Sequence, residues 1–207
     1  MKILLVWIFL LSSLKAVSEP LFVSLGSNCE VAMQLRNHNV RTVAFPFDWL
    51  LTPSLPLLSL LLEEDFSSFL HPDDLIYLPS RGIVNTRYQI YFRHEKDLSF
   101  LVDIQTKYER RIQRFRALKH YEGKVYFLRA ANGPGRVNPS TIITQLEACN
   151  LYETLQKQFP KLHFQLIIIN YLDNASAPFP SLLGIREFKT REGHETLDYS
   201  KILRILK

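Results

Sequence analysis

The sequence feature that most constrains the fold is an apolar strand–helix–strand pattern in the second half of the chain. The segments "KVYFLRA" (124–130) and "LHFQLIIIN" (162–170) are short apolar runs rich in β-branched and aromatic residues, as buried strands are. Between them, "PSTIITQLEACNLYETLQKQFP" (139–160) has the length and spacing of a helix, with Pro139 near its start. A strand, a helix and a strand in this order predict a parallel crossover. We therefore expect an α/β protein, a layered α/β domain with a mostly parallel sheet and flanking helices.

The first half of the chain is compatible with this architecture. A buried strand ending in a glycine turn, followed at once by a helix, is the usual opening of an α/β unit. The amphipathic segment 103–120 spaces its apolar residues three or four apart, with Asp103 as a plausible N-cap. The elements expected before it are a strand at 21–27, a helix at 29–39, one or two buried helices within 53–70 and a half-buried strand at 86–96.

The N-terminus has the layout of a secretory signal peptide. Lys2 is followed by an apolar stretch and then by small residues, with cleavage expected before Glu19. We predict that residues 1–18 are the signal and that residues 19–207 form a single α/β domain. The mature protein would be exported (secreted, periplasmic or extracellular) and would keep no stable membrane span, although an uncleaved anchor is the alternative. Removing the two lysines of 1–18 lowers the formal net charge from +5 to +3, which does not suggest nucleic acid as a partner.

Cys29 is the candidate nucleophile. Ser27 and Glu30 have the spacing of a capping box, which predicts Ser27 as the N-cap and Cys29 at the second helical position. Free N–H groups and the positive end of the helix dipole would stabilise a thiolate there, and the same donors suit an oxyanion. The two residues would cap a helix equally well without any chemistry.

The second cysteine, Cys149, serves as a control. Ile142, Leu146, Cys149 and Tyr152 share one predicted helical face, which suggests that Cys149 is a core residue. With only two cysteines the chain is not a disulfide scaffold, but export would leave a Cys29–Cys149 bridge possible.

A cysteine nucleophile usually needs a histidine base that a third group orients. His94, expected at the end of the strand 86–96, is the preferred base over His194, because a strand end holds a side chain more accurately than a polar tail. Asp173, just beyond the strongest predicted strand, is the preferred third group. Its neighbours Asn170 and Asn174 stay open for that role, whereas Asp48 is better explained as tying a turn beside Trp49.

Several motifs together resemble a known family. "SLGSNCEVAMQLRNHNVRTVAFPFDWLLTP" is followed in order by "HE" at 94–95, "ERRIQRF" at 109–115, "VYFLR" at 125–129 and "LIIIN" at 166–170. This series resembles a bacterial family of unknown function that is labelled a papain-like cysteine peptidase. The resemblance implies a thiol protease, with Cys29 as nucleophile and His94 as base, acting on a peptide or small-molecule substrate. The predicted order of strands nevertheless fits a doubly wound sheet better than the two-lobed form of papain.

An anion- or carbohydrate-binding or group-transfer protein is the alternative function. The loop after residue 130 carries glycines and lies between Arg129 and Arg136, a composition that suits an anionic group. We therefore expect both arginines, together with Asn28 beside the cysteine, to contact the substrate. No cofactor is expected, and no metal, because no histidine or cysteine pair has the spacing of metal ligands.

Overall fold

A computed structural model describes residues 19–95, 97–131, 142–171, 179, 184–190 and 199–206. Its main sheet has four parallel strands in the order β1-β5-β6-β7. These strands are β1 (Leu21–Ser24), β5 (Val125–Ala130), β6 (Phe164–Tyr171) and β7 (Ile185–Thr190). The helix α4 (Gln145–Gln158) connects β5 to β6, so the predicted parallel crossover is confirmed.

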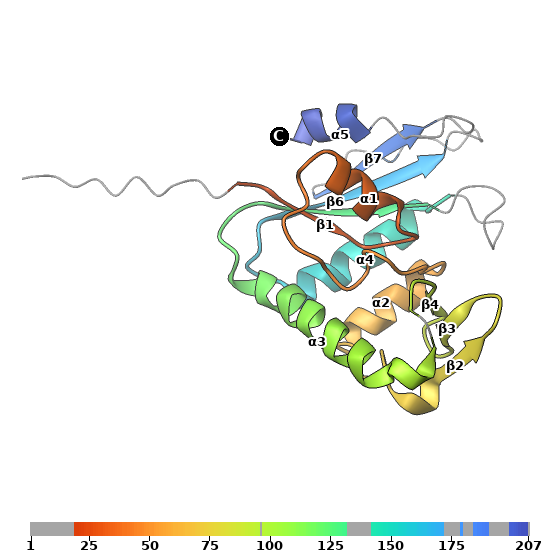
Figure 1. Cartoon of the computed structure of the whole chain (residues 1–207). Helices are drawn as coiled ribbons and strands as arrows, with labels where there is room; N and C mark the ends of the chain where they lie inside the picture. Colours follow the sequence, from red (N-terminus) through yellow and green to blue (C-terminus); the bar gives the residue numbers. More distant parts are fainter. Residues whose placement is uncertain are drawn as a thin grey trace, which may run out of the picture.

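Helices cover both faces of this sheet (Figure 1). On one face, α1 (Glu30–Asn37) and α5 (Tyr199–Leu206) pack on Phe22, Leu128 and Ile167. On the other, α2 (Leu55–Glu63), α3 (Leu101–Ala117) and α4 enclose a larger core with Val23, Phe127 and Ile168. Alternate residues of β1, β5 and β6 thus enter different cores, which is why these strands are mostly apolar, whereas β7 also carries charged residues. The prediction of a layered α/β fold is confirmed.

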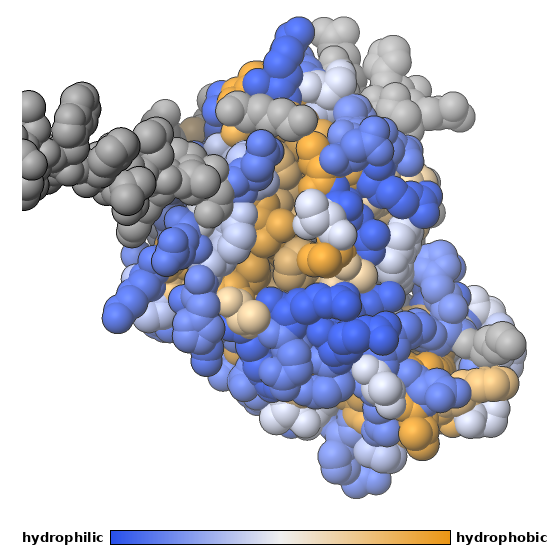
Figure 2. Space-filling model, turned by 60° about the vertical axis from the view of Figure 1, so that its left-hand side comes forward, coloured by the Kyte–Doolittle hydropathy of each residue, from blue (hydrophilic) through white to orange (hydrophobic). Residues whose placement is uncertain are grey.

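A small antiparallel sheet lies in the long connection between α1 and α3. It contains β2 (Leu75–Leu78), β3 (Gly82–Asn85) and β4 (Ile90–Phe92) in that order, and a bridge between Leu51 and Tyr91 extends it. Short 3₁₀ helices lie at Pro72–Asp74, Leu98–Phe100 and Leu118–His120. In Figure 2 hydrophilic residues cover most of one face, and apolar residues show in a recessed strip near its centre.

Several predicted boundaries were wrong. β4 covers only three residues of the predicted strand 86–96, because Gln89 has a φ of 52° and breaks the extended run. α3 begins at Leu101, so Asp103 lies inside the first turn and is not its N-cap. α4 begins at Gln145, after a capping box formed by Thr144 and Glu147 that the sequence analysis missed.

Within the described residues, no helix has the length and apolar character needed to cross a membrane. The predicted signal peptide, residues 1–18, lies outside the described residues, so its cleavage and the export of the protein stay predictions.

Candidate functional site

Cys29 lies at the start of α1, just beyond the end of β1. It is the N-cap residue of the helix, and its carbonyl accepts the first helical hydrogen bond from Met33 N at 2.9 Å. The side chain is partly exposed and the thiol is free. Since β1 and β5 are parallel neighbours, this position is at the carboxyl edge of the sheet, where α/β proteins usually bind ligands.

The predicted capping box does not describe this helix start. Ser27 lies two residues before the N-cap, and Asn28 Oδ1 accepts a hydrogen bond from Glu30 N at 2.7 Å. The N-terminus is therefore shifted by two residues, which places Cys29 at the N-cap and not at the second helical position. Asn28, predicted to contact substrate, uses its side-chain oxygen to close the turn around the cysteine.

The turn before Cys29 has an uncommon backbone. Gly26 has a φ of 78° and Ser27 a φ of 89°, and both residues are buried. Residues with a side chain, such as Ser27, rarely adopt such φ values. Backbone strain of this kind clusters at functional sites. A Cβ on Gly26 would lie 2.8 Å from Thr52 Oγ1, so glycine is required for space as well as for conformation.

Thr52 and Arg129 hold this turn in place. Thr52 Oγ1 accepts from Ser27 N at 3.0 Å, and Thr52 N donates to Ser27 O at 3.0 Å. The Arg129 guanidinium donates to both oxygens of Thr52, and its Nη1 donates to Leu25 O at 3.0 Å. We call these three residues, Ser27, Thr52 and Arg129, the turn clamp. It was missed in the sequence because its partners lie far apart along the chain.

Arg129 is 2% exposed, and its Nε has no hydrogen-bond partner among the described residues. Burial lowers the pKa of Arg129, to about 9, while the carboxylate of Glu147 acts in the opposite direction. The guanidinium is thus charged at neutral pH. Its contacts make it a positioning residue for the turn at Cys29. Arg136, the other predicted substrate arginine, lies outside the described residues.

One segment connects the Cys29 turn with the strand that leads to His94. Thr52 pairs with Ser27, two residues before the cysteine, and Leu51 exchanges backbone hydrogen bonds of 2.9 and 3.1 Å with Tyr91. His94 follows Tyr91 by three residues. The segments that lead to the two predicted catalytic residues are therefore both anchored to residues 51–52.

His94 lies in a turn beyond β4, not at the end of a strand as predicted. Its side chain is exposed, and its ring packs edge-on against Trp49 with 6.1 Å between the centroids. Among the described contacts, none joins His94 directly to Cys29. Asp173 and Asn174 lie outside the described residues. Asn170 is buried, and its side chain bonds Ile143 and Glu187.

Asp48 ties the turn beside Trp49, as predicted. Its Oδ2 accepts from Phe45 N at 3.0 Å and from Arg41 Nε and Nη2 at 2.9 and 2.7 Å. Burial raises the pKa of Asp48, while the hydrogen bond and charge of Arg41 act in the opposite direction. Asp48 therefore has a structural role in the turn that precedes Trp49.

Cys149 is also free, so the Cys29–Cys149 bridge is not formed in this structure. It packs partly buried against the larger core, as does Tyr152, but Leu146, predicted on the same inward face, is 71% exposed. The buried face of α4 consists of Ala148, Leu151, Thr154 and Leu155. In the described part of the chain, no cluster of histidine, cysteine and acidic residues could hold a metal ion.

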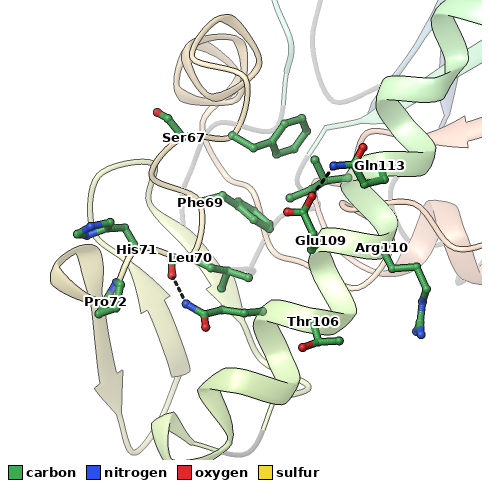
Figure 3. A pocket seen from close by; sticks show the side chains of 12 residues that line it. Ser67, Phe69, Leu70, His71, Pro72, Thr106, Glu109, Arg110 and Gln113 are labelled. Carbon is green, nitrogen blue, oxygen red and sulfur yellow. Dashed lines mark hydrogen bonds between the residues drawn. The ribbon is translucent and has the colours of Figure 1, made fainter.

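A groove of about 720 Å³ lies between residues 66–72 and α3 (Figure 3). Gln105 crosses it to donate to Leu70 O at 3.0 Å, and Glu109 accepts from Gln113 along the helix. Neither Cys29 nor His94 lines this groove. Its walls are Phe66, Ser67, Phe69, Leu70, His71, Pro72, Gln105, Thr106, Glu109, Arg110, Ile112 and Gln113.

The fold and the site define a layered α/β protein that presents a free cysteine at the carboxyl edge of its parallel sheet. The chain belongs to the family described as "Putative papain-like cysteine peptidase (DUF1796)", whose profile matches residues 20–174. The match includes Cys29, the turn clamp and His94, and it supports the cysteine peptidase resemblance at the level of the family.

The chain is also similar to the uncharacterized protein R408 of Acanthamoeba polyphaga mimivirus. The two are 24% identical over 151 residues, which cover 60% of this chain and 68% of the viral protein. This relative is viral, so the expectation of a bacterial family is not supported. No solved structure matches the chain.

Proposed function

We propose that this protein is a cysteine-dependent hydrolase of amide bonds in peptides, with Cys29 as nucleophile and His94 as base. The observation that carries the proposal is a partly exposed free cysteine at the first turn of α1, held by a strained and clamped turn. Membership of a family labelled as cysteine peptidases supports the same chemistry.

The reaction has two steps. The Cys29 thiolate attacks the carbonyl carbon, a C–S bond forms, and the amine leaves with a proton from the protonated base. Water, deprotonated by the same base, then attacks the thioester, which releases the acid and restores the thiol. The N–H groups of the first helical turn have no acceptor within the helix; Glu30 N donates to Asn28 Oδ1, and in this proposal the others stabilise the growing negative charge on the carbonyl oxygen.

Two separate measurements test this proposal. Hydrolysis of a mixed peptide library is followed by mass spectrometry, and alkylation of each cysteine by iodoacetamide is followed by peptide mapping. Cys29→Ala should abolish hydrolysis, whereas Cys149→Ala should retain it. His94→Gln should lower the rate by at least about 100-fold, the usual contribution of a general base.

The covalent intermediate gives a second readout. Cys29→Ser would convert a thioester into a more stable ester, visible as added mass on the intact protein. Hydrolysis that survives in Cys29→Ala would contradict the proposal, and so would alkylation of Cys149 that is faster than alkylation of Cys29.

A further inference from the structure

Trp49 is the centre of a group of positive charges beside the proposed site. The guanidinium carbons of Arg36 and Arg41 lie 5.6 and 5.5 Å from the centre of its ring. His94 contacts the same ring. Trp49 is partly exposed and Arg36 is exposed, whereas the Arg41 side chain is only 17% exposed, so Arg36 is the cation that faces the solvent on the ring that His94 contacts.

The charges of this group are only partly neutralised. A single oxygen of Asp48 accepts two hydrogen bonds from Arg41. The charge of Arg111 also acts on the Asp48 carboxylate. Neither Arg36 nor Arg111 forms an ion pair with any residue of the described chain. In addition, Arg111 Nη1 is buried without a hydrogen-bond partner among those residues. The group therefore keeps unused donors and positive charge.

Neighbouring residues of α3 add to the excess of positive charge. Lys107 pairs with Glu95, and Arg114 Nη1 donates to Ala44 O at 3.2 Å, a neutral partner. Lys107 and Arg111 lie over the ring of Tyr108, at 5.6 and 5.0 Å from its centre, and the charge of Arg111 reaches Asp48 beside Trp49. The groups on the two rings together hold five cations and two carboxylates. We call this set the tryptophan cluster; its cations are Arg36, Arg41, Lys107, Arg111 and Arg114, and its acids are Asp48 and Glu95.

We propose that the tryptophan cluster binds a carboxylate of the substrate, so that this protein selects acidic peptides. Arginine matches a carboxylate with two parallel hydrogen bonds, and a stacked guanidinium is already oriented for this contact. Selectivity in cleavage rests on the proposed function, whereas binding of the carboxylate does not.

The binding test uses the fluorescence of Trp49 in the full chain. The chain has two tryptophans, Trp7 and Trp49, so Trp7→Phe leaves Trp49 as the sole source of tryptophan emission. The probes are acetyl-tetraglutamate amide and acetyl-tetraglutamine amide, which differ mainly in charge. We expect the glutamate peptide to change the emission and bind more tightly, with an affinity that falls as salt is added.

Arg36→Gln and Arg111→Gln should each weaken binding of the glutamate peptide by about tenfold, since a charged hydrogen bond is lost. The matched control is Arg110→Gln, an exposed arginine on the same helix as Arg111 that is not part of the cluster. Arg36 is exposed, so its variant should keep the fold and decides the result if Arg111→Gln proves unstable.

The same titration in a Cys29→Ala background separates this proposal from the hydrolase. Unchanged binding there, with no hydrolysis by the parent protein, would reject the proposed function and keep the carboxylate site. Equal binding of the two peptides would overturn the site, as would an equal effect of Arg110→Gln and Arg36→Gln. Competition by inorganic phosphate at lower concentration than by acetate would also overturn it, in favour of a tetrahedral anion.

Discussion

The starts of α1 and α4 both lie at the carboxyl edge of the parallel sheet, but they are stabilised in different ways. α4 has a complete capping box, in which Thr144 and Glu147 bond each other's backbone N–H groups. The side chain of Asn170, at the end of β6, also bonds the backbone of Ile143, the residue before Thr144. The capping box of α4 therefore needs only residues that are three apart in the sequence.

The start of α1 depends instead on distant residues. Its N-cap is a cysteine without a side-chain capping bond, and two preceding residues have positive φ. Thr52 and Arg129 hold this geometry from elsewhere in the chain. A conformation that is locally unfavourable and maintained by the tertiary structure is typical of a functional site. The comparison therefore favours α1, not α4, as the place where the fold supports chemistry.

The largest effect should come from Gly26→Ala. An alanine there combines a positive φ with a Cβ only 2.8 Å from Thr52 Oγ1, so we expect a loss of about 4 kcal/mol in the free energy of unfolding. Urea denaturation measures this loss. The control is Gly82→Ala, which has a similar φ of 76° but a closest contact of 3.2 Å. A loss no larger than that of Gly82→Ala would show that the turn adapts and is not clamped.

A smaller effect is expected from Thr52→Val, which keeps the shape of the side chain but removes its hydroxyl. Ser27 N and the Arg129 guanidinium would lose an acceptor, at a cost of about 2 kcal/mol. The variant should also slow alkylation of Cys29 while leaving Cys149 unchanged, because the clamp acts on one turn only. Equal changes at both cysteines would indicate a general loss of structure.

The smallest effects should distinguish the two helix starts directly. Thr144→Ala and Asn28→Ala each remove one capping acceptor and should cost about 1 kcal/mol in thermal or urea unfolding. Only Asn28→Ala should alter the alkylation rate of Cys29. If Thr144→Ala altered that rate to the same extent, the two helix starts would not be independent and the comparison would fail.

Local patterns were sufficient to predict most of the parallel sheet. The strands at 125–130 and 164–171 and the helix between them follow from uninterrupted apolar runs and helical spacing. The apolar residues spaced three or four apart in the segment 103–120 are all buried, namely Ile104, Tyr108, Ile112 and Phe115 in α3 and Leu118 directly after it. Here burial repeats with the period of the element, so the sequence itself carries the signal.

Reasoning from periodicity failed where apolar residues are exposed, as in β2 and at Leu146 of α4. β2 went unrecognised because Ile76 and Tyr77, in the middle of the strand, are exposed at 43% and 44%. Leu146 was placed inward because it lies three residues before Cys149, whereas the buried face of α4 runs through Ala148, Leu151 and Leu155. Leu146 lies two residues before Ala148, which is about 200° of helical rotation, so it points away from the buried face.

The sequence by itself determined the α/β class and the presence of a cysteine where the first strand gives way to a helix. Only the tertiary structure decided how that cysteine is held. The hydrogen bonds of the turn clamp span 25, 77 and 104 residues of sequence, from Thr52 to Ser27, from Arg129 to Thr52 and from Arg129 to Leu25. Periodicity reports which residues avoid water within one element, but polar pairing between distant segments has no period, so it becomes visible only when the chain is folded.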